Sequence, residues 1–176
     1  MDDANVPADS WFSGMSSPSY LPRLDHSLSG DDARPHLGAV LLKSKMLSPE
    51  QLDEALAQQA GTGRRLGEVL VEHGWLFPQD IARALATQFG VEYIDIHHVS
   101  VDLAAASRLD PEVGQRCSAI GVRWLTDGTL LVAVADPTSG AVKEVRESLA
   151  CPVAFAVTER DDIQNAWRRL LQGYKP

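Results

Sequence analysis

The chain has 176 residues, 44% of them hydrophobic, with a formal net charge of −8, which suits one ordinary domain or two small ones with a packed core. The acidic balance argues against a broad nucleic-acid-binding surface, because such surfaces are usually basic. No apolar run approaches the ~20 residues that span a bilayer, and the acidic N-terminus lacks the features of a signal peptide. We therefore expect a cytoplasmic protein that does not insert into membranes.

Residues 1–34 are predicted to form a disordered acidic tail. They are rich in Ser, Pro, Asp and Gly, and the first 35 residues hold six Asp against two Arg. Such a composition buries too little apolar surface to offset the entropy lost on ordering. The segment is interpreted either as a plain solvated tail or, because it contains Trp11 and Phe12, as a peptide that docks onto a partner.

An internal repeat follows the tail. Residues 36–59 read HLGAVLLKSKMLSPEQLDEALAQQ and residues 65–88 read RLGEVLVEHGWLFPQDIARALATQ; each copy has 24 residues, the offset is 29, and ten positions are identical. Self-similarity at a fixed spacing indicates a duplicated structural unit. Each copy predicts two helices, so residues 35–90 are expected to form a tandem-repeat, four-helix domain.

The first copy predicts a short amphipathic helix over residues 37–44 and a longer helix after Ser48. Ser48 is expected to cap that helix with Pro49 in its first position and Gln51 closing a capping box. The buried face of the second helix is predicted to consist of Leu52, Ala55 and Leu56.

The second copy predicts the same course. Gly74 is expected to end its first helix as a left-handed cap, and Pro78 begins the next helix with Asp80 near its N-terminus. The buried stripes are predicted to be Leu66, Val69 and Leu70 in the first helix and Ile81, Ala84 and Leu85 in the second.

Residues 91–176 predict a small α+β subdomain with a short sheet. Alternation predicts a strand over 91–96, and Asp127-Gly128 indicates a hairpin between 119–125 and 130–135. A further strand is expected at 152–157, and helices at 103–109, 111–116, 139–149 and 159–171. The fold class is therefore α+β.

Patterns of catalytic chemistry are scarce, and we expect no enzyme and no metal site. HExxH, GxSxG and P-loop motifs are absent from the sequence. His97 and His98 are adjacent, so on a strand they would point to opposite faces and not share a metal. Cys117 and Cys151 are expected to be buried thiols. Trp75 and Phe77 are interpreted either as core residues or as a flat platform for a base.

The repeat positions that core packing does not require are Arg65, Gly67 and Gln88. A helix start offers free N–H groups to an anion, and Gly67 has no side chain to block that approach. Arg65 can grip guanine O6 and N7 with a bidentate fork, and Gln88 can both donate to and accept from a base edge. Two such sets would match a two-fold ligand with two guanines and two phosphates. The alternative is that these are surface, capping and helix-end residues.

The spaced pattern RLGxxLxxxGxxxxxxLxxxLxxQ, present twice, resembles the N-terminal domain of type II secretion and type IV pilus assembly ATPases (MshEN or GspE-N type, in the GspE, PilB and MshE family). The resemblance covers roughly residues 35–172 and includes the segment DPTSGAVKEVRESL. It implies a regulatory domain that, in a subset of the family, binds cyclic di-GMP. Because the chain ends at Pro176 without Walker motifs, we expect a stand-alone copy of that domain.

Carried onto this sequence, the resemblance implies a ligand site with two halves. In the first copy, His36 replaces an Arg and Lys45 replaces a Gly. The loss of one bidentate contact is expected to cost ~1–3 kcal/mol, or about 5- to 150-fold in affinity. Arg34 lies nearby as a possible substitute. One half is expected to comprise Arg65, Leu66, Gly67, Leu70, Gly74, Leu85 and Gln88, and the other His36, Leu37, Gly38, Leu41, Leu56 and Gln59.

Two functions follow from the sequence. The first is a non-enzymatic cyclic di-GMP-binding regulatory module. The second is an adaptor of the same fold that has lost the nucleotide and docks a secretion, pilus or signalling protein.

Overall fold

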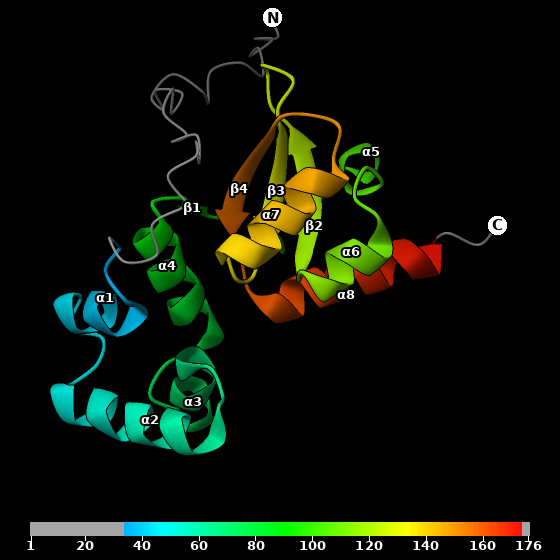
Figure 1. Cartoon of the computed structure of the whole chain (residues 1–176). Helices are drawn as coiled ribbons and strands as arrows, with labels where there is room; N and C mark the ends of the chain where they lie inside the picture. Colours follow the sequence, from blue (N-terminus) through cyan, green and yellow to red (C-terminus); the bar gives the residue numbers. More distant parts are fainter. Residues whose placement is uncertain (1–33, 174–176) are drawn as a thin grey trace, which may run out of the picture.

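A computed structural model describes residues 34–173 of the chain. The predicted tail therefore lies outside the described residues, apart from Arg34. Figure 1 shows a small helical unit at one side of a larger part built around a sheet. This arrangement confirms the α+β fold class.

The helical unit contains the four predicted helices, which are α1 (Leu37–Lys43), α2 (Pro49–Thr62), α3 (Leu66–Glu72) and α4 (Pro78–Phe89). Helix α1 packs on α4, and α2 packs on α3, so the main helix contacts cross between the two copies of the repeat. The buried core of this unit consists of Leu41, Leu47, Ala55, Val69, Leu70, Leu76 and Ala84.

The predicted helix caps are confirmed. Ser48 Oγ accepts a hydrogen bond from Gln51 N at 3.3 Å, and Gln51 Oε1 accepts one from Ser48 N at 3.0 Å, which closes the capping box. Asp80 Oδ2 accepts from Phe77 N at 2.9 Å at the start of α4. The two N-termini are thus stabilised in different ways, because the second copy has Phe77 where the first has Ser48.

The turns after α1 and α3 have the same geometry. Gly74 has a φ of 68°, and Lys45, its counterpart, has a φ of 57°. In the first turn Lys45 N donates to Leu42 O and Met46 N to Leu41 O, which is the Schellman pattern. The second turn repeats both bonds 29 positions later. Lys45 therefore keeps the shape of the turn in a backbone region that favours glycine.

The predicted burial of Leu56 is wrong, since its side chain is 43% exposed. Its counterpart Leu85 packs with Val91 and Tyr93 against a cluster around Val157. The difference arises because α4 is covered on this side by β1 and β4, whereas Leu56 on α2 receives no such cover.

The rest of the chain forms a four-stranded sheet in the order β1-β4-β3-β2. Strands β2 and β3 are the predicted antiparallel hairpin, whereas β4 pairs in parallel with β1 and with β3. The elements in chain order are β1 (Glu92–Tyr93), α5 (Leu103–Ala106), α6 (Pro111–Arg116), β2 (Ala119–Trp124), β3 (Leu130–Val134), α7 (Ser139–Ser148), β4 (Val153–Val157) and α8 (Arg160–Gly173).

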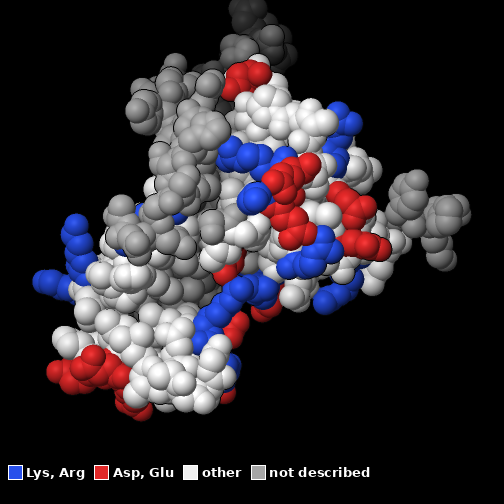
Figure 2. All heavy atoms as spheres, viewed as in Figure 1, with Lys and Arg blue, Asp and Glu red and all other residues white. Residues whose placement is uncertain are grey.

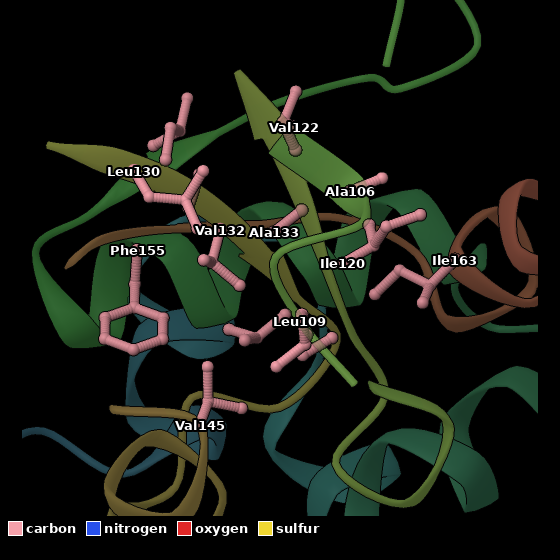
Figure 3. Close-up of a cluster of buried hydrophobic side chains, with 14 of the residues drawn as sticks. Ala106, Leu109, Ile120, Val122, Leu130, Val132, Ala133, Val145, Phe155 and Ile163 are labelled. Atoms are coloured by element: carbon pink, nitrogen blue, oxygen red, sulfur yellow. The ribbon is translucent and has the colours of Figure 1, made fainter. Parts of the chain in front are cut away.

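The core of this part lies around the central strand β3, all of whose residues are buried. Figure 3 shows Val132 of β3, Phe155 of β4 and Val145 of α7 in one apolar cluster that also receives Leu109 and Ile163. The continuous apolar run of β3 is what a strand covered on both sides requires. The sheet consequently provides a rigid support for the loops and helix ends at its edges.

Several predicted elements are shorter than expected. The strand over 91–96 is reduced to β1, because Asp95 Oδ1 accepts from His97 N at 2.9 Å and turns the chain. The helix predicted at 103–109 covers only α5. Cys117 is buried, and burial raises the pKa of its thiol to about 11, but Cys151 is only partly buried. None of the helices within 34–173 is long and apolar enough to cross a membrane.

Candidate functional site

A groove of about 670 Å³ lies where the helical unit meets the sheet part. This volume falls within the ~300–1,000 Å³ of typical small-molecule sites. Figure 2 shows acidic and basic side chains meeting where the two parts adjoin. Six of the thirteen residues that the sequence singled out line the groove, namely Leu37, Gln59, Arg65, Leu66, Gly67 and Leu85.

The other predicted residues lie elsewhere. Leu41 and Leu70 are fully buried in the helical core, and Gly74 forms the turn after α3. His36, Gly38, Leu56 and Gln88 do not line the groove.

Gly67 and Gly38 are required for helix packing. A Cβ on Gly67 would lie 2.9 Å from Ile81 Cγ2, and a Cβ on Gly38 would lie 2.9 Å from Leu52 Cδ1. Such a distance is shorter than a normal contact, so each glycine allows the first helix of its copy to approach the second. The expectation that packing does not require Gly67 is therefore wrong, and Gly67 in addition lines the groove.

The structure pairs the predicted residues differently from the sequence expectation. Gln59, not Gln88, shares the groove with Arg65 and Leu66, because α2 leads through Gly63 directly into α3 and the two helices pack together. The Arg34 guanidinium lies over the ring of Phe89, 5.1 Å from its centre. The C-terminal end of α4, which carries Gln88, therefore lies beside the start of α1. The groove therefore combines the Gln of the first copy with the helix start of the second.

Gln88 has an unusual polar environment. Its Oε1 atom is buried and has no hydrogen-bond partner within residues 34–173. A buried acceptor without a partner costs free energy, so this position is not explained as an ordinary helix-end residue.

Arg65 is held by a residue that sequence reasoning missed. Its Nη1 forms an ion pair with Asp136 Oδ2, although the two residues are 71 positions apart. Asp136 is only 17% exposed, and its other oxygen accepts from Thr138 N at 3.2 Å. No role for Asp136 was predicted from the sequence, since no local signal could have placed it beside Arg65. Both residues of this ion pair line the groove.

The opposite wall is the junction between β4 and α8. Thr158 is 1% exposed, and its Oγ1 has no partner in the part of the chain that the structure describes. Glu159 Oε1 accepts from Tyr93 Oη at 3.0 Å, and Tyr93 Oη accepts from Gln79 Nε2 at 3.2 Å. Burial, together with a hydrogen bond to Asp162, raises the pKa of Glu159. No role for this junction was predicted from the sequence.

The two adjacent histidines contact different carboxylates. His97 Nε2 lies 2.6 Å from Asp162 Oδ1, and His98 Nδ1 lies 2.9 Å from Asp95 Oδ2. Among residues 34–173 no group of three or more His, Cys, Asp or Glu is placed to hold a metal ion.

The two aromatic residues of the second repeat differ in burial. Trp75 packs on the helical core, whereas the side chain of Phe77 is 76% exposed.

Comparison with protein families finds a match to the MshEN domain over residues 89–175. Residues 89–175 are thus similar to the MshEN domain. The match contains Asp136, Thr158 and Glu159, so one wall of the groove lies in the MshEN segment. The family resemblance expected from the repeats is confirmed.

Solved structures extend the likeness to the helical unit. The structure of MshE with cdg, which is cyclic di-GMP, has 29% sequence identity and a TM-score of 0.71, and the match covers 78% of this chain and 99% of that chain. The N-terminal domain of XpsE, with 22% identity and a TM-score of 0.60 over 76% of this chain and 92% of that chain, shows the same fold. No curated protein matches the chain. Because the MshE match covers more of the chain than the MshEN segment, it includes helices of the repeat.

Proposed function

We propose that the chain is a non-enzymatic, cytoplasmic regulatory module that binds cyclic di-GMP and is related to the N-terminal domains of secretion and pilus ATPases. The observation that carries this proposal is the groove itself. It brings Gln59 together with the helix start Arg65–Gly67, in a fold whose relative MshE was solved with that nucleotide.

The chemistry of the groove suits one guanylate half of the ligand. Arg65 offers the planar fork that pairs with guanine O6 and N7. Gln59 can donate to and accept from a base or ribose. Leu66 and Leu85 supply apolar surface beside these polar groups, which is the usual composition of a small-molecule site.

The second half of the ligand would lie toward α1. Leu37 lines the groove and marks the direction in which the site continues. His36 replaces the arginine fork there, and the buried, unpartnered Oε1 of Gln88 is available to a ligand donor. A neutral His offers one donor instead of a fork, so we expect weaker recognition in this half.

Isothermal titration with cyclic di-GMP tests the proposal. We expect Arg65→Ala to weaken binding by about 5- to 150-fold, the loss of one bidentate contact. Arg123→Ala is the matched control, because Arg123 is exposed on β2 and does not line the groove. The proposal fails if the wild-type chain shows no binding at tens of micromolar nucleotide, or if Arg65→Ala binds as tightly as the wild type.

A second candidate function is a nucleotide-independent adaptor that docks a secretion, pilus or signalling protein. The exposure of Leu56 and Phe77 on the helical unit favours it, because neither side chain is used by the core. A defined partner that binds equally with and without cyclic di-GMP, and is lost in the double variant Leu56→Ser, Phe77→Ser, would support this function. Binding that disappears when the nucleotide is removed would contradict it.

A further inference from the structure

The wall of the groove opposite Arg65 contains a buried hydroxyl group, that of Thr158, without a hydrogen-bond partner among the described residues. Thr158 ends β4 and lines the groove, yet its hydroxyl is buried and has no partner among the described residues. A buried hydroxyl without a partner is unfavourable, so folded proteins seldom retain one. A ligand in the groove would satisfy it.

Glu159 presents a carboxylate next to this hydroxyl. It lines the groove, and the chain of hydrogen bonds from Gln79 through Tyr93 holds its Oε1 in place. Gln79 belongs to α4 and Tyr93 to β1, so Glu159 is fixed by both parts of the molecule. A hydrogen bond with Asp162 also engages this carboxyl group.

The two walls therefore differ in the hydrogen bonds that they can form. On the helical wall Arg64 forms an ion pair with Glu72, and Arg65 and Glu68 also lie there; the Arg65 guanidinium is a pure donor. The facing wall offers acceptors from Glu159 and Asp161, since Asp136 is already paired with Arg65, and the guanidinium of its one arginine, Arg160, donates to Ser118 Oγ at 2.7 Å. A ligand with acceptors on one edge and donors on the other would match this polarity.

Guanine has that polarity. Its O6 and N7 atoms are acceptors, and its N1–H and N2–H₂ groups are donors. A carboxylate can accept both donors in a bidentate pair. Adenine has a lone pair at N1 and no amino group at C2, so a carboxylate at this edge would meet an acceptor instead of a donor.

We propose that Thr158 and Glu159 are specificity-determining residues that receive the N1–H and N2–H₂ donors of a guanine whose O6/N7 edge faces Arg65. The inference rests on the proposed function and deepens it. In this arrangement the β4–α8 junction of the MshEN segment selects guanine over adenine. A donor group of the ligand forms a hydrogen bond with the Thr158 hydroxyl, which otherwise has no partner among the described residues.

The test is titration of the full chain with cyclic di-GMP, cyclic di-AMP and cyclic di-inosine monophosphate, which lacks the 2-amino group. The wild type should bind the guanine ligand about tenfold or more tightly than the inosine ligand, which loses one charge-assisted hydrogen bond. Glu159→Gln should weaken the guanine ligand by at least about tenfold and bring the ratio of the two affinities close to one. Glu92→Gln, an exposed glutamate outside the groove, is the matched control and should change neither affinity.

Thr158→Val separates a ligand contact from a merely structural hydroxyl. Removal of the unpartnered hydroxyl should raise the melting temperature of the free chain and weaken cyclic di-GMP about two- to tenfold, the range of one neutral hydrogen bond. Thermal unfolding confirms that each variant folds.

The outcomes are distinguishable. If the wild type binds no cyclic di-GMP, the proposed function itself fails. If it binds and both variants retain wild-type affinity and the same preference for guanine over inosine, only the role of Thr158 and Glu159 is overturned.

Discussion

Lys45→Gly is expected to stabilise the chain. Lys45 adopts a φ of 57° in the turn after α1, at the position where the second copy of the repeat has Gly74 with a φ of 68°. A non-glycine residue in this left-handed region costs about 1–2 kcal/mol. Glycine removes that cost but loses more backbone entropy on folding, by roughly 0.5–1 kcal/mol. The expected net gain is therefore about 0.5–1 kcal/mol.

Thermal unfolding measures this gain. For a chain of this size, 1 kcal/mol corresponds to a shift of about 2–4 °C in melting temperature, so Lys45→Gly should raise it by roughly 1–4 °C. Gly74→Lys is the mirror experiment and should lower it by a similar amount. No other group lies within 4 Å of a Cβ on Gly74, so the cost there comes from the backbone and not from a clash. Lys45→Ala keeps the strained backbone and should bring no comparable gain.

The reasoning is refuted if Lys45→Gly leaves the melting temperature unchanged while Gly74→Lys has no cost. Ligand binding gives a second check. Lys45 does not line the groove, and its turn has the same hydrogen bonds as the turn at Gly74. Lys45→Gly should therefore leave the affinity for cyclic di-GMP unchanged, and a large gain in affinity would show that Lys45 distorts the site.

Three further predictions concern packing, capping and titration. Gly67→Ala should destabilise the free chain by about 1–3 kcal/mol, since its Cβ would lie 2.9 Å from Ile81 Cγ2; a loss of ligand affinity at unchanged melting temperature would contradict the packing role. Ser48→Ala should lower the free energy of unfolding by about 1 kcal/mol, whereas Phe77→Ser at the equivalent cap should raise it by roughly 0.5–1 kcal/mol. Denaturant unfolding that shows a change of the same sign for both variants would contradict this. The pKa of Glu159 is raised by burial and by Asp162, so the folded chain favours the protonated carboxyl group. The stability that this group contributes is present at low pH and is lost as the pH rises through the raised pKa. Glu159→Gln should therefore gain stability relative to the wild type as the pH rises above the ordinary glutamate pKa of about 4.3. A difference in melting temperature between the two proteins that does not change with pH would refute the shift.

Local patterns in the sequence were sufficient to predict the helices of the helical unit and their ends. The repeat, the Ser48 capping box and the turn at Gly74 all depend on residues within a few positions of one another, so periodicity and capping rules could identify them. The hairpin around Asp127-Gly128 was predictable for the same reason. Strand β1 was overestimated because the side chain of Asp95 competes with strand pairing through a local turn.

The site depended on tertiary packing. Sequence order suggested that Arg65 and Gln88 act together, but the pairing of α2 with α3 and of α1 with α4 places Gln59 in the groove with Arg65 instead. Leu56 and Leu85 occupy equivalent repeat positions, and only the sheet beside α4 makes one exposed and the other packed.

The sequence by itself determined the duplicated helices, their ends and the family, because these depend on local spacing. Only the tertiary structure decided which halves of the repeats meet and which residues face them across the groove. Asp136, Thr158 and Glu159 lie about 70 or more positions from Arg65, and their proximity results from docking of the sheet against α4. Spacing along the chain carries no information on such contacts, since they depend on how two separately formed parts pack together.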